Sequence, residues 1–407
     1  MLKSIIRKEI LNNLFSYKFS IIIILSTILI LVSLFVMYRD YRLSLENYEI
    51  LQPKSNEAIA IIPPTPLSIF AKGLDKNLCR SYEIGFGGQI KVGSKQESVN
   101  NLFRLFTTPD LLYIVKVILA LCAMLFAFDV VSGEKEVGTL RQSLSNSVKR
   151  PILIMGKWIG GFTSFVVPFF IAVLLGTILV TMSPLVQMGG ENWAKLGMFL
   201  FSSVLYLAIF FSLGLLISCL THHSSSSLII SLFVWTMLVF FIPNLGNVLA
   251  RQLVEIPTVQ QLEVKRSQIW IKEVFERINR GKNSREVVRS INSENDKLIA
   301  DYRNRFDRLV SVSQNITRIS PAAAFTYLST DLMGTGISEE RRLKKAVLQY
   351  KYLVWNLEGD LPAFAFHRSS IEEVLGFGGL ANLMILILFN MFFFVSAYVA
   401  FLRYDVR

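Results

Sequence analysis

The sequence predicts an all-α, polytopic membrane protein with six membrane-spanning helices. Hydrophobic residues make up 52% of the 407 residues, charged residues only 18%, and the mean hydropathy is +0.48. Ordinary soluble domains contain more charge than this. Six separate apolar segments each reach about 20 residues, the length that a helix needs to cross a bilayer. These segments cover residues 19–38, 111–128, 158–182, 196–220, 228–249 and 375–402.

The net charge of +12 admits two interpretations. Nucleic-acid binding requires basic clusters with interleaved aromatic residues on a soluble surface. The short cytoplasmic loops of membrane proteins also carry an excess of Lys and Arg. Here the basic residues form small clusters beside apolar segments, and no long basic run exists. The charge therefore favours a membrane protein, and no nucleic-acid partner is expected.

The chain opens with an amphipathic segment, residues 1–18, before the first span. Lys3, Arg7 and Lys8 alternate with Ile and Leu there, which suits a helix lying on the membrane surface with its apolar side down. A cleaved signal peptide is the alternative for residues 19–38. Its apolar region is too long for that, and no small-x-small cleavage site follows it. We expect these residues to remain as a membrane helix.

Two long polar segments interrupt the spans. Residues 39–110 form a small first insert, which has a stiff proline-rich piece at 63–66 and in which one or two short strands are expected. In the second insert, residues 250–374, apolar residues recur at three- and four-residue steps, which predicts long helices. A break at 280–283 makes the first two an antiparallel helical hairpin. A third helix is expected at 339–357.

Six spans place both termini on the same side of the membrane. Lys and Arg concentrate in the amino-terminal segment, the loop at 129–157 and the carboxyl-terminal tail. The positive-inside rule makes these short segments cytoplasmic. Both inserts are then extracytoplasmic, since long segments are exempt from the rule.

The loop at 129–157 lies between the second and third spans and is too short to fold as a domain. Val131, Val137, Leu140 and Leu144 fit one face of a helix, with charged residues elsewhere. Such a helix at a membrane surface is either an interfacial turn or a docking element for a partner protein. The residues by themselves leave both interpretations open.

Lys116 is a charged residue within the second span. A lysine in the outer half of a span usually extends its ammonium group to the lipid interface. Charges within spans are also often functional, so a place on a transport path is the alternative.

No catalytic, cofactor or metal site is expected. The three cysteines have no metal-ligand spacing, and the adjacent histidines at 222–223 point apart on a polar turn. The sequence contains no Gly-x-x-x-x-Gly-Lys-Ser/Thr, His-Glu-x-x-His or Gly-x-Ser-x-Gly motif. The chain is therefore not expected to hydrolyse ATP by the P-loop route. A membrane enzyme of another type, using Lys116 or Asp129, is the remaining alternative.

Three groups of motifs carry a resemblance to a known family. Residues 128–141 read Phe-Asp-x-x-Ser-Gly-Glu-Lys-Glu-x-Gly-Thr-Leu-Arg, and Leu-Ser-Asn-Ser-Val-x-Arg at 144–150 and Gly-Lys at 156–157 follow. This resembles the signature of ABC-2 type transporter permeases. One departure lies at 146–148, Asn-Ser-Val, where relatives more often have Asn-Pro-Val. Pro-x-Pro-Leu-Ser at 64–68 with Gly73-Leu74, and Ser320-Pro321 through Phe325 to Gly-Thr-Gly at 334–336, are similar to a branch with large extracytoplasmic inserts, related to copper-maturation and gliding-motility permeases.

The resemblance implies that this loop is a coupling helix, which docks on a separate ATP-binding subunit. Glu134 and Glu136 would pair with basic groups of that ATPase, and Arg141 with an acidic one. The segment at 1–18 is similar to the family's elbow helix. The residues to which the resemblance gives the docking role are Asp129, Ser132, Gly133, Glu134, Lys135, Glu136, Gly138, Thr139, Leu140 and Arg141.

The implied assembly is a pair of permeases, the second identical or a paralogue, with two ATPase subunits in the cytoplasmic (inner) membrane of a bacterial-type cell. The partners would bind the ATP, so this chain needs no cofactor. The alternative function is a membrane scaffold, whose outer helical insert recruits or moves a partner protein without transporting a substrate. The large inserts favour the scaffold, and a lined path through the spans would favour transport.

Overall fold

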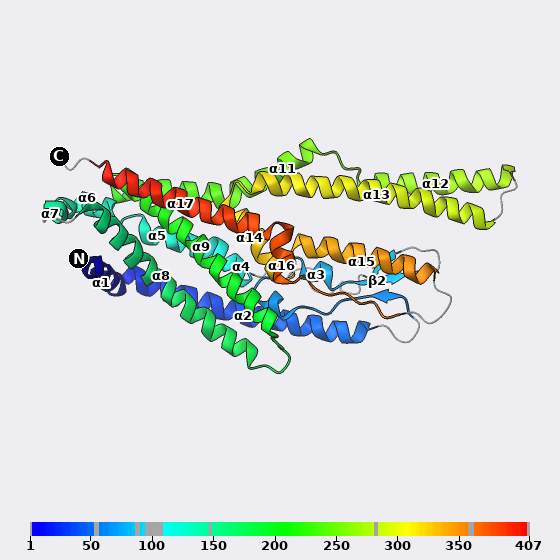
Figure 1. Ribbon diagram of the computed structural model, residues 1–407, viewed down its shortest axis with the longest axis horizontal. Helices are drawn as coiled ribbons and strands as arrows, with labels where there is room; N and C mark the ends of the chain where they lie inside the picture. The colour runs from blue at the N-terminus through cyan, green and yellow to red at the C-terminus, as the bar shows by residue number, and fades with distance from the viewer. Residues whose placement is uncertain are drawn as a thin grey trace. The chain divides into compact units, whose positions relative to one another are not determined.

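The computed structural model describes residues 2–52, 57–85, 90–93, 109–145, 149–280, 284–356 and 362–404. This part of the chain is mostly helical with one small sheet, and six of its helices are long and apolar enough to cross a membrane (Figure 1). The predicted all-α class with six spans is therefore confirmed. The spans are Tyr17–Leu51, Leu111–Val137, Arg150–Thr181, Gly190–Leu220, Ser224–Leu253 and Ile371–Leu402.

The chain divides into two compact units, Met1–Val239 with Ala324–Arg407, and Phe240–Ala323. The first unit contains the membrane bundle. Figure 1 shows α1 and the last turns of α17 at the same end of this bundle as α6 and α7; we call it the α6 end. The helices of the bundle are α1 (Leu2–Leu14), α2 (Tyr17–Leu51), α4 (Leu111–Tyr113), α5 (Ala120–Ala127), α6 (Ser132–Val137), α7 (Thr139–Ser145), α8 (Arg150–Thr181), α9 (Gly190–Leu220), α10 (Ser224–Thr236), α16 (Ile371–Val374) and α17 (Leu380–Leu402), with π-helical segments at Ile114–Leu119, Met237–Phe241 and Leu375–Gly379.

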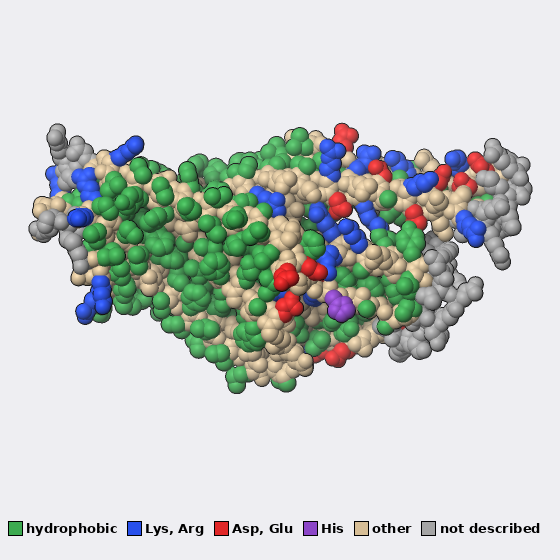
Figure 2. Space-filling view, in the orientation of Figure 1, with side chains coloured by type: hydrophobic (Ala, Val, Ile, Leu, Met, Phe, Trp, Pro, Cys, Tyr) green, Lys and Arg blue, Asp and Glu red, His purple; other side chains and the backbone are tan. Residues whose placement is uncertain are grey.

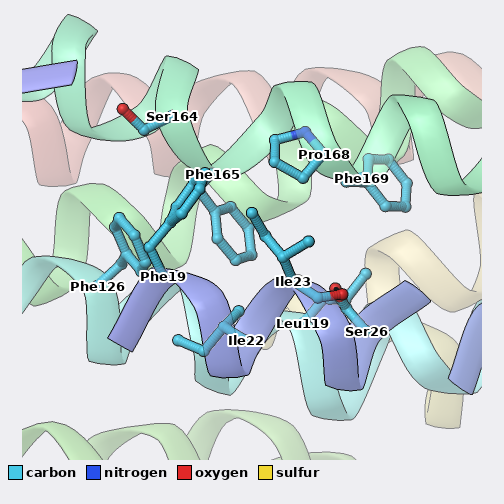
Figure 3. Close-up of a pocket in the computed structure, with 10 residues that line it drawn as sticks. All are labelled: Phe19, Ile22, Ile23, Ser26, Leu119, Phe126, Ser164, Phe165, Pro168 and Phe169. Carbon is cyan, nitrogen blue, oxygen red and sulfur yellow. Dashed lines mark hydrogen bonds between the residues drawn. The ribbon is translucent and has the colours of Figure 1, made fainter. Parts of the chain in front are cut away.

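The bundle is centred on α9, which packs against α5 and α17. It is the most buried span, with 72% of its most apolar stretch inside the protein. Aromatic rings fill the neighbouring contact between α2, α5 and α8 (Figure 3). The ring of Phe126 lies 6.3 Å from that of Phe19 and 5.9 Å from that of Phe165. Hydrophobic side chains cover the face over α8, α9 and α17, and Lys and Arg gather at the α6 end (Figure 2).

Glycines of α8 allow its neighbours to come close. A Cβ on Gly156 would lie 2.6 Å from Ile5 of α1, and one on Gly160 would lie 2.7 Å from Glu9. Small residues permit such close approach of membrane helices. The amphipathic opening segment therefore packs across the start of α8 as the helix α1.

We expect Gly160→Val to displace α1. The new side chain meets Glu9 and the backbone of Ile6, and overpacking of this kind costs about 1–3 kcal/mol. The thermal midpoint in detergent should fall, and protease should cut the chain earlier near residue 15. Gly197→Val on α9 is the control, since nothing lies within 4 Å of a Cβ there. Equal losses in both variants would contradict the close α1–α8 contact.

Segments of both predicted inserts join in one body, which we call the insert platform: residues 57–93 as described, 324–356 and 362–370. It contains an antiparallel sheet in the order β1-β2-β3, where the sequence predicted one or two strands. Ala60, Ile62, Leu78 and Tyr82 from the first insert pack against Leu343, Val347 and Tyr350 of α15. Its elements are β1 (Ile59–Ala60), the short helix Pro66–Ile69, α3 (Asp75–Leu78), β2 (Ser81–Ile84), β3 (Ile90–Gly93), α14 (Pro321–Leu332) and α15 (Ile337–Asn356).

Two motifs that lie more than 250 residues apart meet in this platform. Leu74 donates its backbone N–H to the carbonyl of Thr335 (2.8 Å), and the Thr335 hydroxyl donates to the carbonyl of Ala71 (2.9 Å). Gly73 has φ +43°, and a Cβ there would lie 2.6 Å from the Thr335 oxygen. Both the positive φ and the close backbone approach require glycine.

Asp331 makes the stability of the platform depend on pH. Burial raises the pKa of its carboxyl group to about 6 from an ordinary 3.8, although hydrogen bonds from Ser338 oppose the shift. Between these values the folded protein binds more protons than the unfolded chain, so the free energy of unfolding falls as pH rises through this window. In Asp331→Asn, the thermal midpoint should change less with pH between about pH 4 and pH 6.5 than it does in the wild type. Parallel curves for the two proteins would contradict this assignment.

The second unit holds the predicted helical hairpin. Its helices α12 (Val259–Arg280) and α13 (Ser284–Thr317) lie side by side and antiparallel (Figure 1). The expected break at 280–283 falls at the end of α12, and residues 281–283 lie outside the described chain. Before the hairpin, α11 (Ile242–Leu253) packs on α13, where a Cβ on Gly246 would meet Thr317 at 2.4 Å.

Candidate functional site

Residues 129–145 form a short element at the α6 end, which we call the α6–α7 element. After α5 the chain turns through Asp129–Val131, forms α6, and begins α7 directly after Gly138. Gly138 has φ +81°, the left-handed conformation that ends a helix and favours glycine. The prediction of one helical face from Val131 to Leu144 is therefore wrong. Val131 and Leu140 are buried, whereas Val137 is 77% exposed.

A buried serine of α9 holds the start of α6. The Ser218 hydroxyl accepts the backbone N–H groups of Val131 (3.0 Å) and Ser132 (2.9 Å) and donates to the Ser132 hydroxyl (3.2 Å). The Ser132 hydroxyl donates in turn to the carbonyl of Phe128 (2.9 Å). The first N–H groups of a helix have no partner within the helix, so Ser218 takes the place of a local cap.

Glu134 ties α6 to α8 and α1. The ammonium group of Lys157, a residue only 2% exposed, lies 2.7 Å from Glu134 Oε1 and 3.2 Å from Glu9 Oε1. Lys157 also donates to the carbonyl of Val130 (3.2 Å). A buried ammonium needs such partners, because an unpaired buried charge is very unfavourable. This cluster fixes α6 against the α1–α8 crossing.

Lys135 caps the carboxyl-terminal end of α9. Its ammonium group donates to the carbonyls of Cys219 and Thr221 (2.9 Å to Thr221), with Ser218 O at 3.5 Å. The last carbonyls of a helix have no partner within the helix, and a cation there also interacts favourably with the helix dipole. The same ammonium lies 4.5 Å from the centre of the Tyr404 ring, just beyond α17.

Glu136 caps the amino-terminal end of α10. Its Oε2 accepts the backbone N–H of Ser224 (3.1 Å) and the hydroxyl of the same residue (2.9 Å). Carboxylates are favourable at this end of a helix. Three consecutive charged residues of α6 thus bind three different spans.

Two further contacts complete this end of the bundle. Asp129 forms an ion pair with Lys18 at the start of α2. Arg150, the first residue of α8, donates to the carbonyl of Leu402 (2.8 Å) near the end of α17. The α6 end is therefore braced from every span of the bundle.

The predicted docking residues have different places in the structure. Those that brace α6 against the bundle are Asp129, Ser132, Glu134, Lys135 and Glu136, of which Glu136 is also exposed. Gly138, Thr139 and Arg141 are exposed, and so is Val137, which was not among the predicted residues. Leu140 is buried, and Gly133 is half-buried with a Cβ site 3.6 Å from Ser224. The departure at 146–148 lies outside the described residues.

The bracing partners of α6 were not singled out from the sequence. In the sequence, Lys157 is one of the basic residues of the loop and part of the Gly-Lys motif at 156–157, and no pattern there assigns a bracing role to it or to Glu9, Ser218 or Ser224. The available signal was weak: Glu9 is the one acid in residues 1–18, and Lys157 lies among apolar residues directly after Gly156.

Lys116 lies far from this element along the same span. It is half-buried in the π-helical segment Ile114–Leu119, and its carbonyl accepts the hydroxyl of Tyr206 (2.9 Å). π-Helical turns often occur at functional sites, and the role of Lys116 on a transport path stays a prediction.

Six spans with a short braced element at one end of the bundle define a multi-pass membrane protein. The family described as ABC-2 family transporter protein matches residues 4–406. The chain therefore belongs to this family and is a permease, the membrane component of an ABC transporter. Such a component is not itself catalytic, and the family implies ABC ATPase subunits as partners. Among curated proteins, no relative matches the chain.

Proposed function

We propose that this permease couples ATP hydrolysis by a separate subunit to export, or to mechanical work on the far side of the membrane. The observation that carries the proposal is the bracing of α6: Glu134, Lys135 and Glu136 each bind a different span. A force applied to α6 therefore reaches α8, α9 and α10 together. An element that is only an interfacial turn has no need of such bracing.

The docking surface in this proposal is the junction of α6 and α7. Val137 is a large exposed apolar residue there, followed by the exposed residues Gly138, Thr139 and Arg141. Arg141 would meet an acidic group of the ATPase, and Glu136 a basic one in addition to Ser224. Ion pairs of this kind give orientation more than affinity. ATP is bound by the partner, and this chain carries no cofactor.

The α6 end is cytoplasmic in this proposal and the insert platform is extracytoplasmic, in a bacterial-type inner membrane. The basic residues at the α6 end, among them Lys3, Arg7, Lys149 and Arg150, support this orientation by the positive-inside rule. Two permeases, identical or paralogous, would present two α6–α7 elements to two ATPase subunits. The spans of both permeases would be surrounded by membrane lipid. We also propose that the chain belongs to the branch of the family related to copper-maturation and gliding-motility permeases.

One observation favours mechanical work over transport as the output. The platform has its own apolar core, built from both inserts, so it can move as a body. The second candidate function is accordingly a scaffold whose outer segments recruit or move an extracytoplasmic partner protein.

The test is recovery of the tagged full-length chain in mild detergent, followed by mass spectrometry and an ATPase assay. We expect a stoichiometric partner with a Walker motif and vanadate-sensitive turnover. Recovery of an inactive chain alone, from membranes where it is intact and folded, would contradict the proposal.

A further inference from the structure

The central helix α9 is enclosed by other parts of the protein over residues 202–219. Ser202, Ser203, Ser212 and Ser218 on it are all fully buried. A Cβ on Gly214 would lie 2.9 Å from the carbonyl oxygen of Met124, so α5 is in close contact. With 31 residues, α9 spans about 45 Å at 1.5 Å per residue. It is long enough to join the two ends of the bundle.

One end of α9 is attached to α6. Ser218 accepts two N–H groups at the start of α6, and Lys135 of α6 caps the last carbonyls of α9. Ser218 is fully buried, so these hydrogen bonds do not compete with bulk water. Movement of α6 therefore displaces the end of α9.

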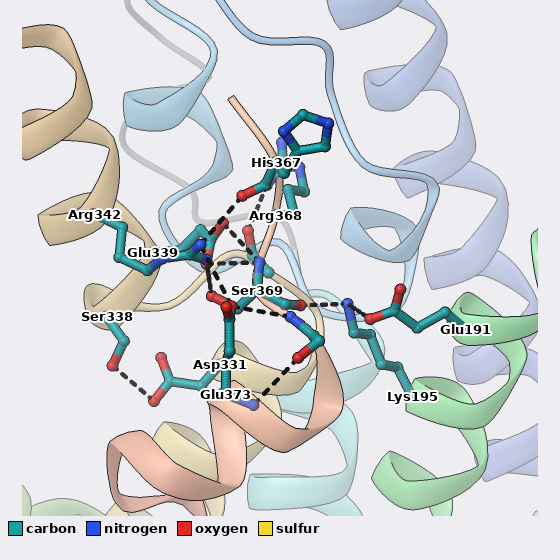
Figure 4. A network of polar contacts seen from close by, with 12 residues as sticks. Glu191, Lys195, Asp331, Ser338, Glu339, Arg342, His367, Arg368, Ser369 and Glu373 are labelled. Atoms are coloured by element: carbon teal, nitrogen blue, oxygen red, sulfur yellow. Dashed lines mark hydrogen bonds and ion pairs between the residues drawn. The ribbon is translucent and has the colours of Figure 1, made fainter. Parts of the chain in front are cut away.

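The other end of α9 is attached to the platform through Lys195 (Figure 4). This residue is 5% exposed, and its ammonium group donates to the carbonyl of Ser369 (2.6 Å) and pairs with Glu191 (3.0 Å). Ser369 donates its backbone N–H to Glu339 Oε1 (3.2 Å), at the start of α15. Arg342 also binds both Ser369 and Glu339. The next residue, Ser370, is the N-cap of α16 at the start of the sixth span.

A second contact joins the middle of α9 to the platform. The ring of Phe325 on α14 stacks on Tyr206 with centroids 4.4 Å apart and planes at 10°, and lies 6.2 Å from Phe199. Phe325, Tyr206 and Phe199 are all completely buried. α14 leads into Thr335, which holds the first insert.

We propose that α9 is the transmission element of the permease, which moves with α6 at one end and shifts the insert platform at the other. This inference rests on the proposed function and adds the helix through which movement passes from α6 to the platform. Its positioning residues are Lys135, Ser218, Lys195 and Phe325. The motif at 128–141 and the motif at 320–336 both contact α9. A conformational change at the α6 end can therefore reach the insert platform through α9 without a path of charged residues.

The competing route is α2, which also contacts both ends. Lys18 pairs with Asp129 at the α6 end, and Asp40 pairs with Lys72 of the first insert. However, the side chains of Lys18 and Asp129 are 56% and 31% exposed, and exposed ion pairs contribute little. The buried contacts of α9 make it the stronger connection.

Hydrogen–deuterium exchange of the full-length chain in lipid nanodiscs tests this route without the ATPase. In Lys135→Met, α9 loses its cap, and we expect exchange to become several-fold faster in platform peptides covering 334–345 and 366–373. Lys18→Met releases α2 and Glu136→Ala, which removes the acceptor of Ser224, releases α10. Neither variant should change these peptides. A change confined to the α6 end in Lys135→Met, or a platform change in Lys18→Met instead, would overturn the proposal.

The reverse experiment provides a second, independent test, because energetic coupling between two sites is reciprocal. Lys195→Met should speed exchange in the peptide covering 131–137. Arg368→Gln is the matched control, since its guanidinium binds Gly334 and Pro63 of the platform. No effect of Lys195→Met on α6, or an equal effect of both variants, would contradict transmission through α9. Failure to recover an ATPase leaves both exchange experiments readable.

Discussion

Replacement of Lys157 by Met should destabilise the protein more than any other single change at the α6 end. Its ammonium group binds Glu134, Glu9 and the Val130 carbonyl, and the residue is almost fully buried. The variant leaves two carboxylates facing each other without a cation. Loss of one partner from a buried ion pair costs about 3–5 kcal/mol. The expected result is a large drop of the thermal midpoint in detergent, with release of α1.

Lys149→Met is the matched control for this experiment. Lys149 lies eight positions earlier, just before α8, and is exposed. Removal of an exposed charge should change stability by less than about 0.5 kcal/mol. Equal midpoints for the two variants would show that the Lys157 cluster does not brace the bundle.

Replacement of Val137 by Asp should strongly weaken assembly with the ATPase and leave the permease folded. The side chain is 77% exposed in the isolated chain, so the change costs little before docking. An uncompensated charge buried in the complex costs about 3 kcal/mol, which corresponds to roughly a hundredfold loss of affinity. Co-purification of the ATPase with the tagged variant, at a thermal midpoint equal to that of the wild type, measures this loss.

Asn12→Asp adds the same charge at an exposed position of α1 and should retain the ATPase. Equal recovery with Val137→Asp and Asn12→Asp would remove the α6–α7 junction from the interface.

The spans and the helical hairpin could be predicted because their signals are local. An apolar run of about 20 residues identifies a membrane helix wherever it packs. The recurrence of apolar residues at three- and four-residue steps likewise predicts α12 and α13 without their neighbours. The extension of α2 to Leu51 was not predicted, because residues 39–51 are polar. The third strand was missed because β1 has only two residues and depends on pairing with β2.

The sequence resemblance points to the α6–α7 element as the candidate site, but it gives none of the contacts that its residues make. The resemblance directed Glu134 and Glu136 toward the ATPase, whereas the structure has Glu134 bound to Lys157 and Glu136 bound to Ser224. These partners lie 23 and 88 residues further along the chain. A single sequence gives no signal for pairs so far apart, and the same holds for Gly73 and Thr335. The role of these carboxylates in docking itself stays a prediction.

The most direct test of ATPase docking at α6 is photo-cross-linking from position 137 in intact membranes. A photoreactive phenylalanine analogue replaces Val137, and in a matched variant it replaces Val92, an exposed valine of β3 in the insert platform. The account predicts that the Val137 variant forms an adduct with a polypeptide carrying a Walker motif and that the Val92 variant does not. An ATPase adduct from position 92, or none from position 137 in membranes that yield the intact complex, would contradict it.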